Sequence, residues 1–250
     1  MIVREGFEMA TFTDDFLSQQ RLLVLAPHSD DETAGAGGLM ARVKQAGGEV
    51  YVMVASTGNL DHFDGKDGKL VSKNLRGEEL SNAMKVLGVD DHEILYEDDG
   101  VHLALEMLPR RELVDQIERK ARLSMEKTRP TMVVLPAASF NQDHEAMFKA
   151  GITACRPHLA SLKAFQYYVL IADAPQLSWS VPPGFKPNFY VDITGVCLEK
   201  KLQAYACHQS QQRPDPSQGG VEALRLLAEN RGREISVEAA EAFDCYRFVI

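Results

Sequence analysis

The sequence predicts an α/β fold, a single domain in which helices flank a mostly parallel β-sheet. Short apolar runs alternate with longer helical segments along the 250 residues, which is the pattern of βαβ units. Several runs are apolar at consecutive positions, as expected of strands that are buried on both faces. No internal repeat interrupts the alternation. We therefore expect one domain over residues 21–250, preceded by an N-terminal arm over residues 1–20.

Regular structure is expected to begin with a βαβ unit. Leu22–Ala26 is predicted as a buried strand. A helix is predicted from Thr33 to Ala46, ending at the C-cap signal Gly47-Gly48. Val50–Ala55 is the next strand, and it is parallel to the first because the helix forms a right-handed crossover.

The remaining elements follow from the same apolar and capping signals. Strands are expected at Ile94–Tyr96, Thr131–Pro136, Phe165–Ile171 and Tyr190–Ile193. Helices are expected at Leu75–Leu87, Arg110–Lys127, His144–Cys155, Leu198–Cys207, 221–231 and near 236–242. Two long loops are expected, a polar one at 57–73 and a proline-rich one at Pro175–Pro187 around Trp179.

Composition narrows the classes of function. The chain has 36 acidic and 27 basic residues and a net charge of −9, which disfavours nucleic acid and anionic membranes as partners. Its four cysteines show no CxxC spacing and are expected to be free thiols in a reducing compartment. The first twenty residues lack a signal-peptide apolar region, and no run has the length of a membrane span. These features predict a cytoplasmic protein without a membrane span, and a homo-oligomer is compatible with them.

The loop after the first strand concentrates ionisable side chains. His28, Asp30, Asp31 and Glu32 fall within five positions. Ligands of open α/β sheets bind at the carboxyl ends of the strands, which is where this loop lies. Helix capping would explain the carboxylates but not the histidine beside them. We favour a metal site in which one imidazole and one carboxylate bind a divalent ion and a second carboxylate serves as base.

The glycines that follow this loop do not form a dinucleotide-binding motif. A GxGxxG frame starting at Gly35 needs Gly or Ala at position 40, which is Met40. The carboxylates of the preceding turn would also repel a pyrophosphate. We expect Gly35, Gly37 and Gly38 to allow the helix to pack closely on the sheet.

A second cluster follows the strand Thr131–Pro136. It contains Asn141, Asp143 and His144, at the same edge of the sheet as the first cluster. Two histidines and one carboxylate form the usual ligand set of catalytic zinc, and they also suit Fe²⁺. Two such clusters at two strand ends favour a metal site over isolated structural histidines.

Both clusters resemble motifs of the PIG-L/LmbE-like zinc N-deacetylases. PHSDDE at 27–32 is similar to the PHPDDE signature of that family, with Ser29 in place of Pro. NQDH at 141–144 is similar to its HxDH motif, with Asn141 in place of His. The resemblance extends from about residue 21 to residue 248.

This resemblance implies a Rossmann-like fold and hydrolysis of an N-acetyl group. The implied substrate is an N-acetylglucosamine-type sugar, either free or as a lipid- or glycan-linked conjugate. Carried over by position, His28, Asp31 and His144 would hold Zn²⁺, with Fe²⁺ or another divalent ion as alternatives. Asp30 would be the general base that takes a proton from water.

Asn141 and Asp143 complete the implied catalytic set. Asn141 can donate an amide N–H to the tetrahedral oxyanion, but it lacks the charge of the histidine found in the family. Alternatively, His208 fills that space, or catalysis is weak and the chain is a sugar-binding or assembly protein on the same scaffold. Asp143 is expected to orient Asn141 or His144.

Arg76 and Asp99 are the candidate substrate-binding residues. Arg76 begins an RxxE motif and Asp99-Gly100 matches a sugar-pocket Asp-Gly of the same family. The alternative for Arg76 is an ion pair with Glu79 or Asp99. Three other histidines show no partner pattern and are expected on the surface: His92, His102 and His158.

Overall fold

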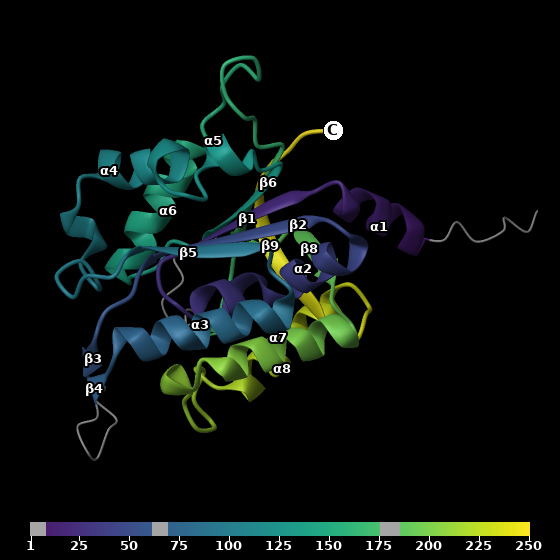
Figure 1. Ribbon diagram of the computed structural model, residues 1–250. Helices are drawn as coiled ribbons and strands as arrows, with labels where there is room; N and C mark the ends of the chain where they lie inside the picture. Colours follow the sequence, from purple (N-terminus) through teal and green to yellow (C-terminus); the bar gives the residue numbers. More distant parts are fainter. Residues whose placement is uncertain (1–8, 62–69, 176–185) are drawn as a thin grey trace, which may run out of the picture.

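A seven-stranded sheet with the order β5-β2-β1-β6-β7-β9-β8 forms the centre of the molecule (Figure 1). The structure is a computed structural model, and it describes residues 9–61, 70–175 and 186–250. The five strands from β5 to β7 are parallel, whereas β9 is antiparallel to both β7 and β8. The predicted α/β domain with a mostly parallel sheet is confirmed. The sheet comprises β1 (Arg21–Ala26), β2 (Glu49–Ser56), β5 (Asp91–Tyr96), β6 (Met132–Pro136), β7 (Tyr168–Ala172), β8 (Phe189–Asp192) and β9 (Ala240–Phe248).

Helices cover both faces of this sheet (Figure 1). One face carries α2 (Asp31–Ala46), α3 (Lys73–Leu87), α7 (Val196–Cys207) and α8 (Val221–Glu234). The other carries α4 (Arg110–Asp115), α5 (Met125–Thr128) and α6 (Gln142–Ala154). The shorter elements are α1 (Met9–Ser18), the hairpin of β3 (Leu60–Asp61) and β4 (Leu70–Val71), the 3₁₀ turns η1 (Leu105–Met107) and η4 (Gln209–Gln211), and the π turn η2 (Gln116–Lys120).

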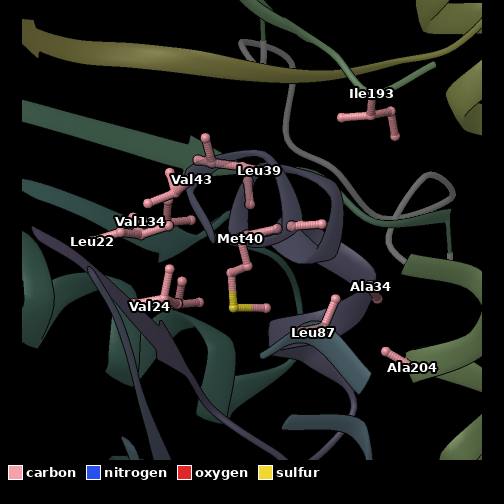
Figure 2. Packing of buried hydrophobic residues seen from close by; sticks show 14 of the residues in the cluster. Leu22, Val24, Ala34, Leu39, Met40, Val43, Leu87, Val134, Ile193 and Ala204 are labelled. Carbon is pink, nitrogen blue, oxygen red and sulfur yellow. The ribbon is translucent and has the colours of Figure 1, made fainter. Parts of the chain in front are cut away.

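The apolar runs of the strands supply two cores because successive side chains point to opposite faces. Leu22 and Val24 of β1 join the cluster on the α2 face, and Figure 2 shows them with Met40 of that helix. Leu23 and Leu25 join the cluster under α4 and α6. Burial on both faces explains why the strand sequence does not alternate between apolar and polar residues.

Helix α2 packs closely on the sheet at its glycines, as predicted. A Cβ atom on Gly38 would lie 2.7 Å from Cγ2 of Ile193, and one on Gly35 would lie 3.0 Å from Cβ of Ala172. The carboxylate of Glu241 in β9 accepts hydrogen bonds from the N–H groups of Gly38 and Leu39 at 2.7 and 2.6 Å. These contacts fix α2, which carries the first acidic cluster at its start.

The predicted helix over Arg110–Lys127 is wrong as a continuous element. It divides into α4, the π turn η2 and the short α5. The backbone becomes extended at Ala121, with ψ 155°. The N–H groups of Arg122 and Leu123 then donate to the carboxylate of Glu93 in β5. This contact with a distant strand satisfies donors that a longer helix would have used.

The helical segment expected near 236–242 is also wrong, because Ala240–Phe248 forms strand β9. Its alanine and glutamate content favours a helix, but β9 pairs on both sides, with β7 and β8. Tertiary pairing overrides local propensity here.

Within the predicted arm of residues 1–20, the described part is helix α1. Leu17 is buried, and the ring of Phe16 lies 5.1 Å from that of Tyr168, so α1 packs on the domain. Residues 62–69 of the 57–73 loop lie outside the described residues, as do residues 176–185 of the Pro175–Pro187 loop, which include Trp179. Among the helices that the structure describes, none combines the length and apolarity needed to span a membrane.

Candidate active site

The two acidic clusters meet at the carboxyl ends of the adjacent strands β1 and β6. His28 follows β1, Asp31 is the first residue of α2, and His144 lies in the first turn of α6. Nδ1 of His28 and Nε2 of His144 each lie 3.2 Å from Oδ2 of Asp31. One donor atom from each of the three residues lies within 4.8 Å of the other two. The structure thus brings together the three residues predicted as metal ligands.

The electrostatics of these three residues suit a cation. Burial lowers the pKa of His28, but the carboxylates of Asp143 and Asp31 on either side raise it to about 9. Burial raises the pKa of Asp31, but His144 and His28 outweigh this and hold it well below its usual range. The pocket therefore favours positive charge at its centre. Two imidazole nitrogens and a carboxylate oxygen are also the donor set of zinc sites with an open position, so these residues fit a divalent ion.

Asp143 orients His28 rather than Asn141 or His144, which differs from the expectation. Its Oδ2 lies 2.9 Å from Nε2 of His28, and its Oδ1 accepts a hydrogen bond of 2.9 Å from the N–H of Leu105. Asp143 is completely buried. A hydrogen bond from Nε2–H to this carboxylate leaves Nδ1 of His28 to act as a ligand, which is how buried carboxylates support histidine ligands of metals.

Replacement of Asp143 by Asn is expected to weaken metal binding by about 10- to 100-fold, because His28 loses its charged hydrogen-bond acceptor. Competition with a chromophoric chelator measures this change. Asp91→Asn is a matched control, since Asp91 pairs with Arg122 at the edge strand β5. An unchanged metal affinity in Asp143→Asn would contradict the supporting role of Asp143.

Asp30 lies beside the ligands with its carboxylate unengaged. Within the described residues no group donates a hydrogen bond to its side chain, and its backbone φ is 135°. Burial and the neighbouring charge of Asp31 raise the pKa of Asp30 to about 7, and Arg76 opposes that shift. A carboxylate with a pKa near neutrality is suited to accept and return a proton.

Asn141 caps helix α6. Its Oδ1 accepts hydrogen bonds from the N–H groups of Asp143 at 3.0 Å and of His144 at 3.4 Å. Its Nδ2 has no partner in the described part of the chain. Helix capping and donation to an oxyanion therefore use different atoms, and the oxyanion role stays a prediction.

Arg76 is buried and bound within the protein. One terminal nitrogen lies 2.9 Å from Nε2 of His102, and the other donates to the carbonyl oxygen of Ser29 at 3.0 Å. Among the described residues Arg76 forms neither expected ion pair. The carboxylate of Glu79 accepts hydrogen bonds from Ser210, and the exposed Asp99 accepts them from Asn59. Arg76 and Asp99 remain predicted substrate-binding residues.

His102 is buried, so its predicted surface location is wrong. It is 6% exposed, and its ring lies 5.4 Å from that of His28. Burial, Arg76 and His28 together lower the pKa of His102 to about 4, so the ring is neutral. His102 follows β5 at the same edge of the sheet as the two clusters. This position after a strand is the feature of the sequence that could have placed it near the site. His92 and His158 are half-buried.

Glu32 and His208 form a second buried pair beside Asp30. Oε1 of Glu32 lies 3.0 Å from Nε2 of His208, and neither side chain is exposed. Burial lowers the pKa of His208, but Glu32 outweighs this and raises it. Oε2 of Glu32 accepts a hydrogen bond of 2.9 Å from the N–H of Asp30. His208 is thus paired with Glu32, next to the loop that carries the candidate base Asp30.

Two histidines and a carboxylate at the ends of parallel strands, with a free carboxylate beside them, define a candidate metal-dependent hydrolase. Residues 23–155, more than half of the chain, match the family model of PIG-L, described as GlcNAc-PI de-N-acetylase. The chain belongs to this family, as its two motifs indicated.

Individual relatives extend the similarity over nearly the whole chain. The diacetylchitobiose deacetylase of Thermococcus kodakarensis is 29% identical over 94% of this chain and 85% of its own length. The uncharacterized deacetylase YaiS of Escherichia coli is 32% identical over 54% of this chain and 68% of its own. Among solved structures, the conserved protein TT1542 of Thermus thermophilus is 26% identical, with a TM-score of 0.69 over 93% of this chain and 97% of that one.

Proposed function

We propose that the protein hydrolyses the N-acetyl group of an N-acetylglucosamine-type sugar or of a conjugate that carries one. The observation that carries the proposal is the His28, Asp31 and His144 donor set with the free carboxylate of Asp30 beside it. The similarity to diacetylchitobiose deacetylase over 94% of the chain supports this substrate class. Zn²⁺ is the ion that we expect, because the donor set is that of catalytic zinc sites.

In the proposed hydrolysis, different residues of the chain would bind the ion, transfer the proton and stabilise the oxyanion. A divalent ion held by His28, Asp31 and His144 would polarise the amide carbonyl and favour ionisation of water. Asp30 accepts the proton of the attacking water and returns it to the leaving amine nitrogen, which a carboxylate with a pKa of about 7 can do in both directions. Nδ2 of Asn141 donates to the oxyanion as the tetrahedral centre forms.

Arg76 and Asp99 would bind hydroxyl groups of the sugar. Asp99 is exposed, and the buried Arg76 acts on Asp30 electrostatically.

All four cysteines are free thiols. Free thiols are typical of a reducing compartment, so we propose that the protein acts in the cytoplasm.

Metal analysis combined with acetate release over a panel of N-acetyl sugars tests this function. We expect about one divalent ion per chain, acetate release from an N-acetylglucosamine-type sugar, loss of activity after chelation and recovery with Zn²⁺. Metal and sugar binding without acetate release would instead support the sugar-binding alternative. A protein that binds neither would contradict both.

A further inference from the structure

Ser29 lies between the ligand His28 and the candidate base Asp30, and it is completely buried. Its hydroxyl donates a hydrogen bond to the carbonyl oxygen of Arg76 at 3.2 Å. Its own carbonyl oxygen accepts a hydrogen bond of 3.0 Å from the Arg76 guanidinium. Two hydrogen bonds in opposite directions therefore tie this loop to the first turns of α3. We call this pair of bonds the Ser29–Arg76 clamp.

The clamp adjoins a backbone conformation that needs support. Asp30 has φ 135° and ψ −30°, a region that residues with a side chain rarely adopt. Such strained conformations persist only where surrounding contacts hold them. The peptide between Ser29 and Asp30 is held at both polar atoms, because its N–H donates to Glu32 and its carbonyl oxygen accepts from Arg76 in the clamp.

We propose that Ser29 is a positioning residue, and that the Ser29–Arg76 clamp fixes the loop in the way that a proline at position 29 would. Ser29 is not among the described residues with positive φ, so its φ has the sign that a proline ring imposes. In the described part of the chain its N–H donates no hydrogen bond, so a proline would remove none. A serine backbone is freer than that of proline, and the two hydrogen bonds supply the missing restriction. The inference rests on the proposed roles of His28 and Asp30.

Three variants test the clamp. Ser29→Ala removes the hydroxyl and its hydrogen bond but keeps the carbonyl oxygen that accepts from Arg76, whereas Ser29→Pro removes the same hydroxyl and adds the restraint of the proline ring. Ser124→Ala is the matched control, since Ser124 is also completely buried and its hydroxyl has no hydrogen-bond partner. Each variant is assayed at a temperature at which circular dichroism shows the metal-free protein to be folded.

Two measurements are made on each variant. The first is the Zn²⁺ dissociation constant. It should rise about tenfold in Ser29→Ala, because residues that support metal ligands have effects of this size. In Ser29→Pro it should return towards the wild-type value. The second is hydrogen–deuterium exchange of the 27–34 segment in metal-free protein. Exchange there should increase in Ser29→Ala and be restored at the remaining amides in Ser29→Pro, and Ser124→Ala should match wild type in both measurements.

Exchange and zinc affinity in Ser29→Ala that equal those of wild type overturn the proposal. A folded Ser29→Pro that is as perturbed as Ser29→Ala overturns the equivalence to proline. Failure of the proposed function is recognised separately, because the wild-type protein would then release no acetate or bind no Zn²⁺, whereas the exchange measurement in metal-free protein still decides on the clamp.

Discussion

Replacing Asp30 with Asn is expected to lower kcat by about 10²- to 10⁴-fold while the metal stays bound. The asparagine has the same shape but cannot accept a proton from water. It should not disturb the ion, because Oδ2 of Asp31 is the carboxylate atom that faces both His28 and His144. The Asp30 side chain accepts no hydrogen bond within the described residues, so its substitution leaves no donor unpaired there.

Asp31→Asn is the matched comparison, since it makes the same chemical change one residue later. That variant should lose the metal, because it removes the anionic ligand between the two histidines. Metal content and kcat, measured on both variants after gel filtration, separate the two roles. If Asp30→Asn loses the ion and Asp31→Asn retains it, the assignments of base and ligand are reversed.

The sequence could predict that His28, Asp31 and His144 lie together, because their signal is local. His28 and His144 each follow an apolar strand, and parallel strands place their carboxyl ends at one edge of the sheet. The cap of α2 was equally local, since Gly47 adopts the left-handed conformation that ends this helix.

What the sequence did not reveal depends on contacts between distant segments. The partner of Asp143 is His28, which is 115 positions away, and Arg76 reaches Ser29 across 47 positions. Strand β9 was misjudged for the same reason, because its pairing with β7 and β8 decides its conformation. Spacing within a motif records which residues share a loop, but not which buried donor meets which acceptor across the fold.

Asn141 stands at the position where the motif of the family has a histidine. The amide of Asn141 is oriented without a side-chain acceptor, because its Oδ1 accepts from two N–H groups at the start of helix α6. The oxygens of Asp143 bond instead to Nε2 of His28 and the N–H of Leu105. Asn141 is therefore compatible with the rest of this site.

Asn141→Ala is expected to lower kcat by about 10²- to 10³-fold with little change in KM, because a donor used only in the transition state leaves ground-state binding intact. The same variant loses the cap of α6, which should lower the free energy of unfolding by about 1 kcal/mol, or about 2–4 °C in Tm. Activity and stability must therefore be separated with a second variant. Asn141→Ser provides this, since serine is as good a cap as asparagine but has no amide N–H.

If Nδ2 of Asn141 stabilises the oxyanion, Asn141→Ser should melt close to the wild-type temperature and still lose most of its kcat. If Asn141 only caps the helix, Asn141→Ala should melt lower with a normal kcat, and Asn141→Ser should resemble wild type in both measurements. Oδ1 is already engaged with two backbone N–H groups, so the side chain is held in place before substrate arrives. A donor held in this way needs no reorganisation during the reaction, which is the property that makes a neutral group effective in an oxyanion hole.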